Sequence, residues 1–306
     1  MNGHRRGIAL VVAAAAACTA TAAALAALQT PQQVTTAQGR QTIPAAEAGG
    51  AYLAYAQSRP TNRNRYDVYV KQAGQPRIKV NRKGVAWPGG FDGNSFVYQQ
   101  AYRGQSDIHL FDLTTHQRSV PPSVNTPRWE WQPTISNGWI LYGQEWGSRP
   151  VNDRVILWNS GTSDRRILDS QVGSPNELLW PGQVNQDYVT WARWARRNTR
   201  LNVFRYQIST QTTVMVPRPV DRAQYAGSVS SDGTIFYVRS HLTCGSHVVI
   251  HEYDPNTATD TALAAMPAGY DINVTYTVDE GPGVHTIYFD RFRCSTGASH
   301  IYKISA

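Results

Sequence analysis

Short runs of alternating apolar and polar residues follow one another along most of the chain. The segment 230–240, "SSDGTIFYVRS", shows the plan, with a polar turn, a glycine and then apolar residues that end on Tyr237. Five other segments follow the same plan: 48–58, 91–102, 136–146, 184–194 and 281–291. Alternation with a period of two is typical of half-buried β-strands. The pattern therefore predicts an all-β chain.

These runs recur at a nearly constant spacing. The aromatic residues that end them lie 43, 44, 49, 46 and 52 residues apart: Tyr55, Tyr98, Tyr142, Trp191, Tyr237 and Phe289. Each run is followed by a second strand such as "DVYVKQ" (67–72), and all but the last by a short third such as "PRIKV" (76–80). A further, often proline-marked segment such as "WQPTIS" (131–136) precedes the next turn. Four strands per repeat and a period in the forties are typical of propeller blades.

Two repeats carry a family resemblance. The segment "WQPTISNGWILY" (131–142) with "VILWN" (155–159), and "SVSSDGTIFYV" (228–238) with "IHEYD" (250–254), resemble the TolB-type propeller repeat. The resemblance covers about residues 34–306 and concerns the propeller part only, without the N-terminal domain of TolB. It implies a six-bladed β-propeller, and its degenerate motifs specify a fold rather than a function.

The ends of the chain predict how the ring closes. The last repeat supplies three strands and then stops, so its outermost strand is missing. The segment "QVTTAQGR" (33–40) precedes the first inner strand and has the β-branched residues to fill this gap. We expect it to pair with the last blade, because this removes an open sheet edge. Residues 31–306 then form one propeller.

Residues 1–30 have a different character. A basic start with Arg5 and Arg6 precedes an uncharged, apolar run over 7–28. This is the organisation of an export signal, and the run is also long enough for an uncleaved membrane anchor. We therefore expect a secreted protein or one anchored outside the cytoplasm. Without the two arginines the net charge is 27 − 21 = +6, a mild excess that favours anionic envelope polymers or glycans.

Two cysteines remain in the mature chain, Cys244 and Cys294. In an exported protein an isolated pair predicts a disulfide, here between the loops of the last two blades. A Cys₂His₂ metal site with His247 and His300 is the alternative, although the spacing lacks a paired C-x₂-C arrangement. We assign no metal or cofactor.

The loops between the second and third strands of the blades are rich in arginine. They belong to the face where the connections between blades also emerge, and their arginines are Arg59, Arg63, Arg65, Arg149, Arg193, Arg196, Arg197, Arg200, Arg291 and Arg293. Interleaved tryptophans such as Trp191 and Trp194 add stacking surfaces. These residues form either a positive rim for a ligand or solvated hairpin tips.

A second series of side chains precedes the inner strands. Aromatic residues recur there, at Trp87, Trp129, Trp131, Trp180, Tyr225 and Tyr270, and they either ring the channel mouth or pack between blades. Irregular polar residues break the repeat and are therefore better functional candidates: Arg128, Glu130, Glu145, Glu177, Asp221, Arg222, Asp271 and Asn273. Glu130, between two tryptophans, is the most suggestive carboxylate.

These features define the candidate site and its function. The ligand-binding candidates are Trp129, Glu130, Trp131, Glu177, Trp180, Asp221, Arg222, Tyr225, Arg193, Arg196 and Arg197. No catalytic motif is present, so we expect a non-catalytic, monomeric binding module for a protein, glycan or anionic envelope polymer, with no specific nucleic-acid partner. The alternative is an extracellular enzyme that acts on a glycan or small molecule at the channel mouth. Asp232 is interpreted as a turn-forming residue on the opposite face.

Overall fold

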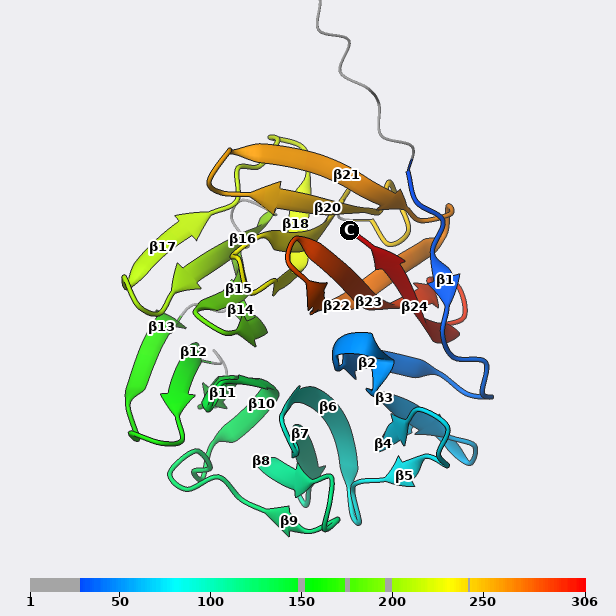
Figure 1. Ribbon diagram of the computed structural model, residues 1–306, viewed down its shortest axis with the longest axis vertical. Coiled ribbons are helices and arrows are strands. Elements are labelled where there is room, and N and C mark those ends of the chain that lie inside the picture. Colours follow the sequence, from blue (N-terminus) through cyan, green and yellow to red (C-terminus); the bar gives the residue numbers. More distant parts are fainter. Residues whose placement is uncertain (1–27, 148–151, 174–176, 196–199, 242) are drawn as a thin grey trace, which may run out of the picture.

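Six four-stranded antiparallel sheets form a ring around a central axis (Figure 1). This computed structural model describes residues 28–147, 152–173, 177–195, 200–241 and 243–306. The expected all-β, six-bladed propeller is confirmed, and the export segment falls almost entirely outside the described residues. The described part holds one turn of 3₁₀ helix, η1 (Ala48–Gly50), and no helix there is long and apolar enough to cross a membrane.

Each blade is built from four strands that are consecutive in space. Blade 1 contains β2 (Gln41–Ala46), β3 (Tyr52–Arg59), β4 (Asn62–Gln72) and β5 (Ile78–Lys79). Blade 2 contains β6 (Val85–Asp92), β7 (Ser95–Tyr102), β8 (Gln105–Asp112) and β9 (Arg118–Ser119). Blade 3 contains β10 (Trp129–Ser136), β11 (Trp139–Trp146), β12 (Asn152–Asn159) and β13 (Arg165–Gln171).

The second half of the ring follows the same order from the inside outward. Blade 4 contains β14 (Glu177–Asn185), β15 (Tyr188–Ala195), β16 (Arg200–Gln207) and β17 (Thr212–Met215). Blade 5 contains β18 (Ala223–Val229), β19 (Ile235–Ser240), β20 (Val249–Asp254) and β21 (Thr259–Ala265). Blade 6 contains β22 (Tyr270–Gly281), β23 (Val284–Arg293), β24 (Ser299–Ser305) and β1 (Gln32–Gln33).

The ring closes through its N-terminal segment, as the sequence predicts. Strand β1 pairs antiparallel with β24, and the backbone N–H of Val34 adds a bond to the carbonyl oxygen of Ile301 at 2.8 Å. The paired part is shorter than the predicted segment 33–40 and begins one residue earlier. Because Gln29 N–H also donates to the carbonyl oxygen of Leu263 in blade 5, the segment contacts two blades.

The core lies within and between the blades. The aromatic residues that end the predicted runs lie on the second strands, and four of them are among the largest fully buried side chains: Tyr98, Tyr142, Tyr237 and Phe289. Burying a large apolar side chain contributes about 1.5–3 kcal/mol, so the repeated aromatic position is a main source of stability. Its repetition in sequence thus reflects packing.

The two ends of the central channel differ in their loops. At one end lie the connections between blades and the loops between second and third strands, and we call it the cavity mouth. At the other end lie the tight turns between first and second strands, and we call it the turn mouth. Asp232 lies in such a turn, where its carboxylate accepts a bond from Thr234 N–H at 3.0 Å and Gly233 has φ +89°. The interpretation of Asp232 as a turn-forming residue is confirmed.

Candidate functional site at the cavity mouth

A cavity of about 550 Å³ opens at the cavity mouth, and all six inner strands contribute to its wall. Its wall is mainly apolar, and five aromatic side chains line it: Tyr66, Trp87, Trp180, Tyr225 and Phe292. A few polar groups from different blades join them, among them Gln132, Asn273 and Asp271. An apolar cavity with a few convergent polar groups is the usual composition of a small-molecule site.

The inner strands are irregular at the level of this cavity. In each of them the pairing with the second strand shifts register, for example between Trp131 and Thr134. Three non-glycine residues at these bulges adopt positive φ: Ile43 at 53°, Gln132 at 47° and Ala226 at 52°. A branched residue such as Ile43 rarely adopts this conformation. Bulges re-aim side chains, and here the bulged residues line the cavity.

A layer of hydrogen bonds lies between this cavity and a smaller hollow at the turn mouth. The side-chain amide of Gln183 in blade 4 donates to the carbonyl oxygen of Thr277 in blade 6 at 2.7 Å, and Thr277 N–H donates back at 2.9 Å. The hydroxyl of Ser228, in the blade between them, lies 2.7 Å from the hydroxyl of Thr277. These bonds cross the channel and tie three inner strands together.

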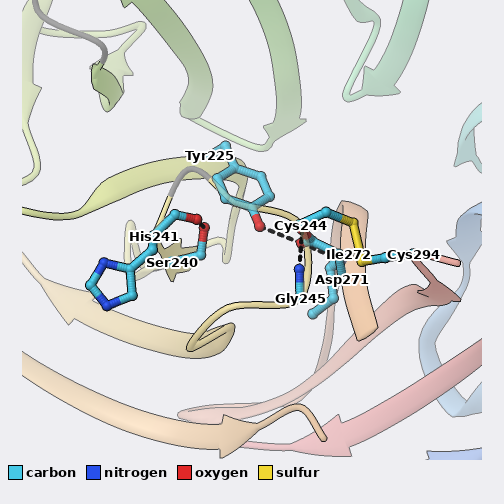
Figure 2. Close-up of a disulfide and its surroundings, with 8 residues drawn as sticks. All are labelled: Tyr225, Ser240, His241, Cys244, Gly245, Asp271, Ile272 and Cys294. Carbon is cyan, nitrogen blue, oxygen red and sulfur yellow. Dashed lines mark hydrogen bonds between the residues drawn. A yellow bond between two sulfur atoms is a disulfide. The ribbon is translucent and has the colours of Figure 1, made fainter. Parts of the chain in front are cut away.

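Asp271 is the carboxylate that the described residues bring into the cavity wall. It is the second residue of β22 and is 9% exposed. Figure 2 shows the Tyr225 hydroxyl and the Gly245 N–H directed at its carboxylate. Tyr225 donates at 2.5 Å, Ile272 N–H at 2.8 Å and Gly245 N–H at 3.2 Å. Burial and the adjacent Asp271 charge raise the pKa of Tyr225, so its hydroxyl stays protonated and donates.

A disulfide joins the two loops beside Asp271. Cys244 and Cys294 are bonded, which confirms the predicted pairing and links blades 5 and 6 (Figure 2). One carboxylate oxygen of Asp271 and the two sulfur atoms lie within 4.8 Å of one another. The two cysteines are close in sequence to His241 and Phe292, which line the cavity. The disulfide therefore holds part of the cavity wall in place.

A second buried acid lies on the strand behind the wall. Asp290 on β23 accepts bonds from the backbone N–H groups of Asn273 and Val274, both at 3.1 Å, and from the hydroxyl of Thr42 in blade 1. It is fully buried, and burial raises its pKa to about 6. Its bonds hold the bulge of β22 against blade 1.

The comparisons with known proteins concern the fold. No protein-family model matches the chain, and no curated protein is similar to it in sequence. An oligogalacturonate lyase in complex with manganese superposes with a TM-score of 0.55 and 11% identity, over 86% of this chain and 76% of that one. TolB from Acinetobacter baumannii gives a TM-score of 0.55 and 15% identity, over 84% of this chain and 64% of that one.

A third structure gives a contrast at the point of closure. The β-propeller domain of the Trilobed protease from Pyrococcus furiosus has a TM-score of 0.55 and 10% identity, with 87% of this chain and 83% of that one covered. That domain has an open velcro topology, whereas here β1 pairs with β24. The fold of the chain is that of a TolB-type six-bladed β-propeller.

Within this TolB-type propeller, the aromatic candidates divide between two environments. Trp180 and Tyr225 line the cavity, as does Trp87. Trp131 instead packs inside blade 3, where a Cβ atom on Gly143 would lie 2.5 Å from its indole ring. Trp129 is half-buried at the start of the same strand and does not line the cavity.

Glu130 occupies the interior of blade 3 rather than the cavity wall. Its side chain is fully buried and accepts bonds from the Thr126 hydroxyl at 2.6 Å and the Gln144 amide at 2.7 Å. Burial raises its pKa. Glu130 and Asp271 hold equivalent positions, two residues before the bulge of their inner strands. The same strand position therefore leads to different environments in the two blades.

The charged candidates of the described rim have partners of their own. Arg193 forms an ion pair with Asp169 at 2.7 Å, and Arg222 forms one with Asp221 at 2.5 Å. The Arg222 guanidinium also lies 2.8 Å from the ring nitrogens of His241. Arg196, Arg197 and the side chain of Glu177 lie outside the described residues.

Several cavity residues carry no clear sequence signal. Tyr66, Gln132 and Phe292 reach the cavity through strand bulges and loop positions that alternation does not predict. Asp271 and Asn273 do have such a signal, because both break the repeat. The rule that functional residues interrupt a repeat therefore points to the cavity, although it ranks Glu130 above Asp271.

Proposed function

We propose that the protein is a non-catalytic binding module that holds a segment of an extracellular glycan in the cavity mouth. The observation that supports this proposal most strongly is the cavity of about 550 Å³ with its five aromatic side chains and its few polar groups. A sugar ring has apolar C–H faces and hydroxyl groups around its edge. Flat aromatic rings can stack on the C–H faces, and polar side chains such as Gln132 and Asn273 can form hydrogen bonds with the hydroxyl groups.

The composition of the cavity supports binding rather than catalysis. Hydrolysis of a glycosidic bond usually requires two carboxylates at a fixed separation, and Asp271 is the one carboxylate among the described lining residues. The hydroxyl of Ser240, which also lines the cavity, donates to the carbonyl oxygen of His241 at 2.7 Å. It is therefore engaged with the backbone instead of with a histidine base.

The cavity lining disfavours a polyanion, because no lysine or arginine is among its described residues. Of the rim arginines, Arg59 pairs with Asp67 at 2.7 Å and Arg193 with Asp169 at 2.7 Å, so an acid neutralises each of these two. We place the function outside the cytoplasm, since a disulfide is typical of proteins from oxidising compartments.

Binding to an oligosaccharide panel, followed by calorimetry with the best ligand, tests the proposal. Trp180→Ala and Trp87→Ala should each weaken binding about 10-fold, because a stacking contact contributes roughly 1–1.5 kcal/mol. Tyr102→Ala is the matched control, since Tyr102 is 41% exposed and does not line the cavity.

Three results would count against this function. The first is no binding to any glycan in the panel, and the second is an equal loss of binding in Tyr102→Ala. The third is turnover of a bound glycan that disappears in Asp271→Asn, which would support the enzyme alternative. Loss of binding to anionic polymers in Arg196→Ala with Arg197→Ala, with no effect of the tryptophan changes, would instead support recognition by the basic loops.

A further inference from the structure

We propose that the ligand of the cavity carries an ammonium group and that Asp271 recognises it. The inference rests on the proposed glycan-binding function and narrows it to glycans with free amino groups. It starts from the charge of the cavity wall. Among the described lining residues no lysine or arginine occurs, and Asp271 is the only carboxylate. The cavity lining therefore favours a cation over an anion, with His241 as its one basic side chain among the described residues, even though the chain as a whole is basic.

Asp271 is one of four buried acids without a cationic partner among the described residues, the others being Glu130, Asp153 and Asp290. Asp67, by contrast, has both Arg59 and Lys79. The donors to Asp271 are a tyrosine hydroxyl and two backbone N–H groups, which are neutral. A buried carboxylate without a countercharge is costly, and a cationic ligand would supply that countercharge.

Glu130, Asp153 and Asp290, the other described buried acids that have no cationic partner, do not line the cavity. Glu130 is enclosed within blade 3, and Asp290 lies behind β22 with four donors directed at it. Burial raises the pKa of both groups. Of these four acids, Asp271 alone combines burial with a position on the cavity wall. Its partner can therefore enter from outside.

Aromatic rings complete the environment of an ammonium group. Tyr225 touches Asp271 directly, and Phe292 is its paired residue on β23. Trp87 of blade 2 and Trp180 of blade 4 line the same cavity. The face of an aromatic ring attracts a cation, and an indole ring attracts it most strongly. A carboxylate on one side and aromatic faces around it form a site suited to an ammonium ion.

The carboxylate is held in one orientation before any ligand arrives. The Tyr225 hydroxyl and the backbone N–H groups of Ile272 and Gly245 restrain it, and Gly245 lies next to Cys244 in the 243–245 loop. The disulfide to Cys294 anchors this loop to blade 6 (Figure 2). One carboxylate oxygen has the Gly245 N–H as its described donor, at 3.2 Å, and so keeps acceptor capacity for a ligand. Preorganisation of this kind increases affinity, because little order is lost on binding.

The class of ligand that fits this chemistry is an amino sugar with a free amine. The matched probes are a glucosamine tetramer and an N-acetylglucosamine tetramer, which differ in charge but share the sugar backbone. At pH 6 the full-length protein should bind the glucosamine tetramer more tightly. Asp271→Asn should weaken binding of this tetramer about 10- to 100-fold, the range of a charge-assisted hydrogen bond, and change binding of the acetylated tetramer less than about 3-fold.

Asp164→Asn is the control, because Asp164 is an acid whose side chain is 43% exposed and which does not line the cavity. It should leave the affinities for both tetramers within about 2-fold, since an exposed charge is screened by salt. If Asp271→Asn does not fold, the salt dependence of the unmodified protein decides. Affinity for the glucosamine tetramer should fall when the NaCl concentration is raised roughly 10-fold, from about 0.05 to about 0.5 M. Affinity for the acetylated tetramer should stay the same.

The outcomes separate this inference from the proposed function. Equal affinity for the two tetramers, or an equal loss of both in Asp271→Asn, overturns the ammonium site and leaves glycan binding intact. Tighter binding of the acetylated tetramer does the same. Binding of neither tetramer, or of any other oligosaccharide, overturns both proposals. A loss confined to the glucosamine tetramer supports both.

Discussion

The two ends of the channel use the same six inner strands and treat their acids in opposite ways. At the turn mouth, Asp279 accepts bonds from Asn185 of blade 4 at 2.8 Å, from Ser231 N–H of blade 5 at 3.1 Å and from His285 at 3.0 Å. At the cavity mouth, Asp271 has three neutral donors and no cationic partner among the described residues. The acid at one end therefore has a histidine partner from the chain, whereas the acid at the other end has neutral donors.

The buried acids near the two ends of the channel also differ in the direction of their pKa shifts. Hydrogen bonds from His285, Asn185 and Ser231 lower the pKa of Asp279. Conversely, the hydrogen bond with Asp279 raises the pKa of His285. The Nε2 atom of His285 also lies 3.5 Å from a carboxylate oxygen of Asp232. Behind the cavity mouth, burial instead raises the pKa of Asp290 to about 6. A compensated charge stabilises the folded ring, whereas a buried and uncompensated charge destabilises it.

The largest expected effect concerns the covalent link, which only the cavity mouth has among the described residues. The pair of changes Cys244→Ser and Cys294→Ser should lower the free energy of unfolding by about 4 kcal/mol, the chain-entropy estimate for a loop of this length. Chemical denaturation with and without a reducing agent measures the loss. The reductant should destabilise the unmodified protein and leave the double variant unchanged; a loss below about 1 kcal/mol would contradict this role of the disulfide.

A smaller effect distinguishes the acids of the two ends by pH. The folded-state pKa of Asp290 lies above its unfolded value, so the folded protein binds the proton more tightly. Stability therefore falls as pH rises from about 4 to about 6, by roughly 3 kcal/mol for this group. Asp290→Asn should remove this fall, as measured by urea unfolding at several pH values.

Asp187→Asn at the turn mouth is the control for the pH experiment. Hydrogen bonds from Ser209 and Gln207 lower the pKa of Asp187, so its contribution to stability is fully present above about pH 4 and is lost as the pH falls below that value. The two variants should thus change the pH dependence in opposite directions. A change in the same direction would show that the two ends do not differ in this way.

The smallest of the three effects tests the turn mouth itself. Asp279→Ala removes the partner of His285, Asn185 and Ser231 N–H and should cost about 2 kcal/mol near pH 6. The loss should shrink above the ordinary pKa of histidine, because the raised pKa of His285 makes its contribution full below about 6.5 and lost as pH rises. It should also shrink at low pH, where Asp279 is protonated.

The change His285→Gln separates these two limits. In the His285→Gln background, the stability cost of Asp279→Ala should no longer become smaller above neutral pH. It should still become smaller at low pH, because Asp279 keeps Asn185 and Ser231 as donors. Denaturant titrations at about pH 3, 6 and 8, which extend below the ordinary aspartate pKa and to either side of the ordinary histidine pKa, provide the measurement. A loss in Asp279→Ala that is independent of pH would assign its role to packing.

Much of the fold follows from the sequence because it depends on local, repeated signals. Alternation and the aromatic residue that ends each run predict the strands, and the spacing from Tyr55 to Phe289 predicts six blades. The turn at Asp232 follows from an acid and a glycine after an inner strand. The closing strand is predicted from the strand missing in blade 6, although its bounds are two residues, Gln32–Gln33, instead of eight.

The candidate site follows from the sequence only in part. Trp180 and Tyr225 are predicted ligand residues that line the cavity, whereas Glu130 lies inside blade 3. Alternation cannot separate Glu130 from Asp271, because both precede a bulge by two residues. Neighbours distant in sequence separate them: Gln144 and Thr126 enclose Glu130, and Tyr225 and Gly245 hold Asp271 at the cavity wall.

By itself, then, the sequence determined the number of blades, the closing strand, the disulfide and the turn-forming residues, since each depends on local pattern, on composition or on pairing of chain ends. Only the tertiary structure decided which acids face the cavity and which are compensated. The charge environment of a side chain depends on residues from other blades, and the ring brings these together only when it closes.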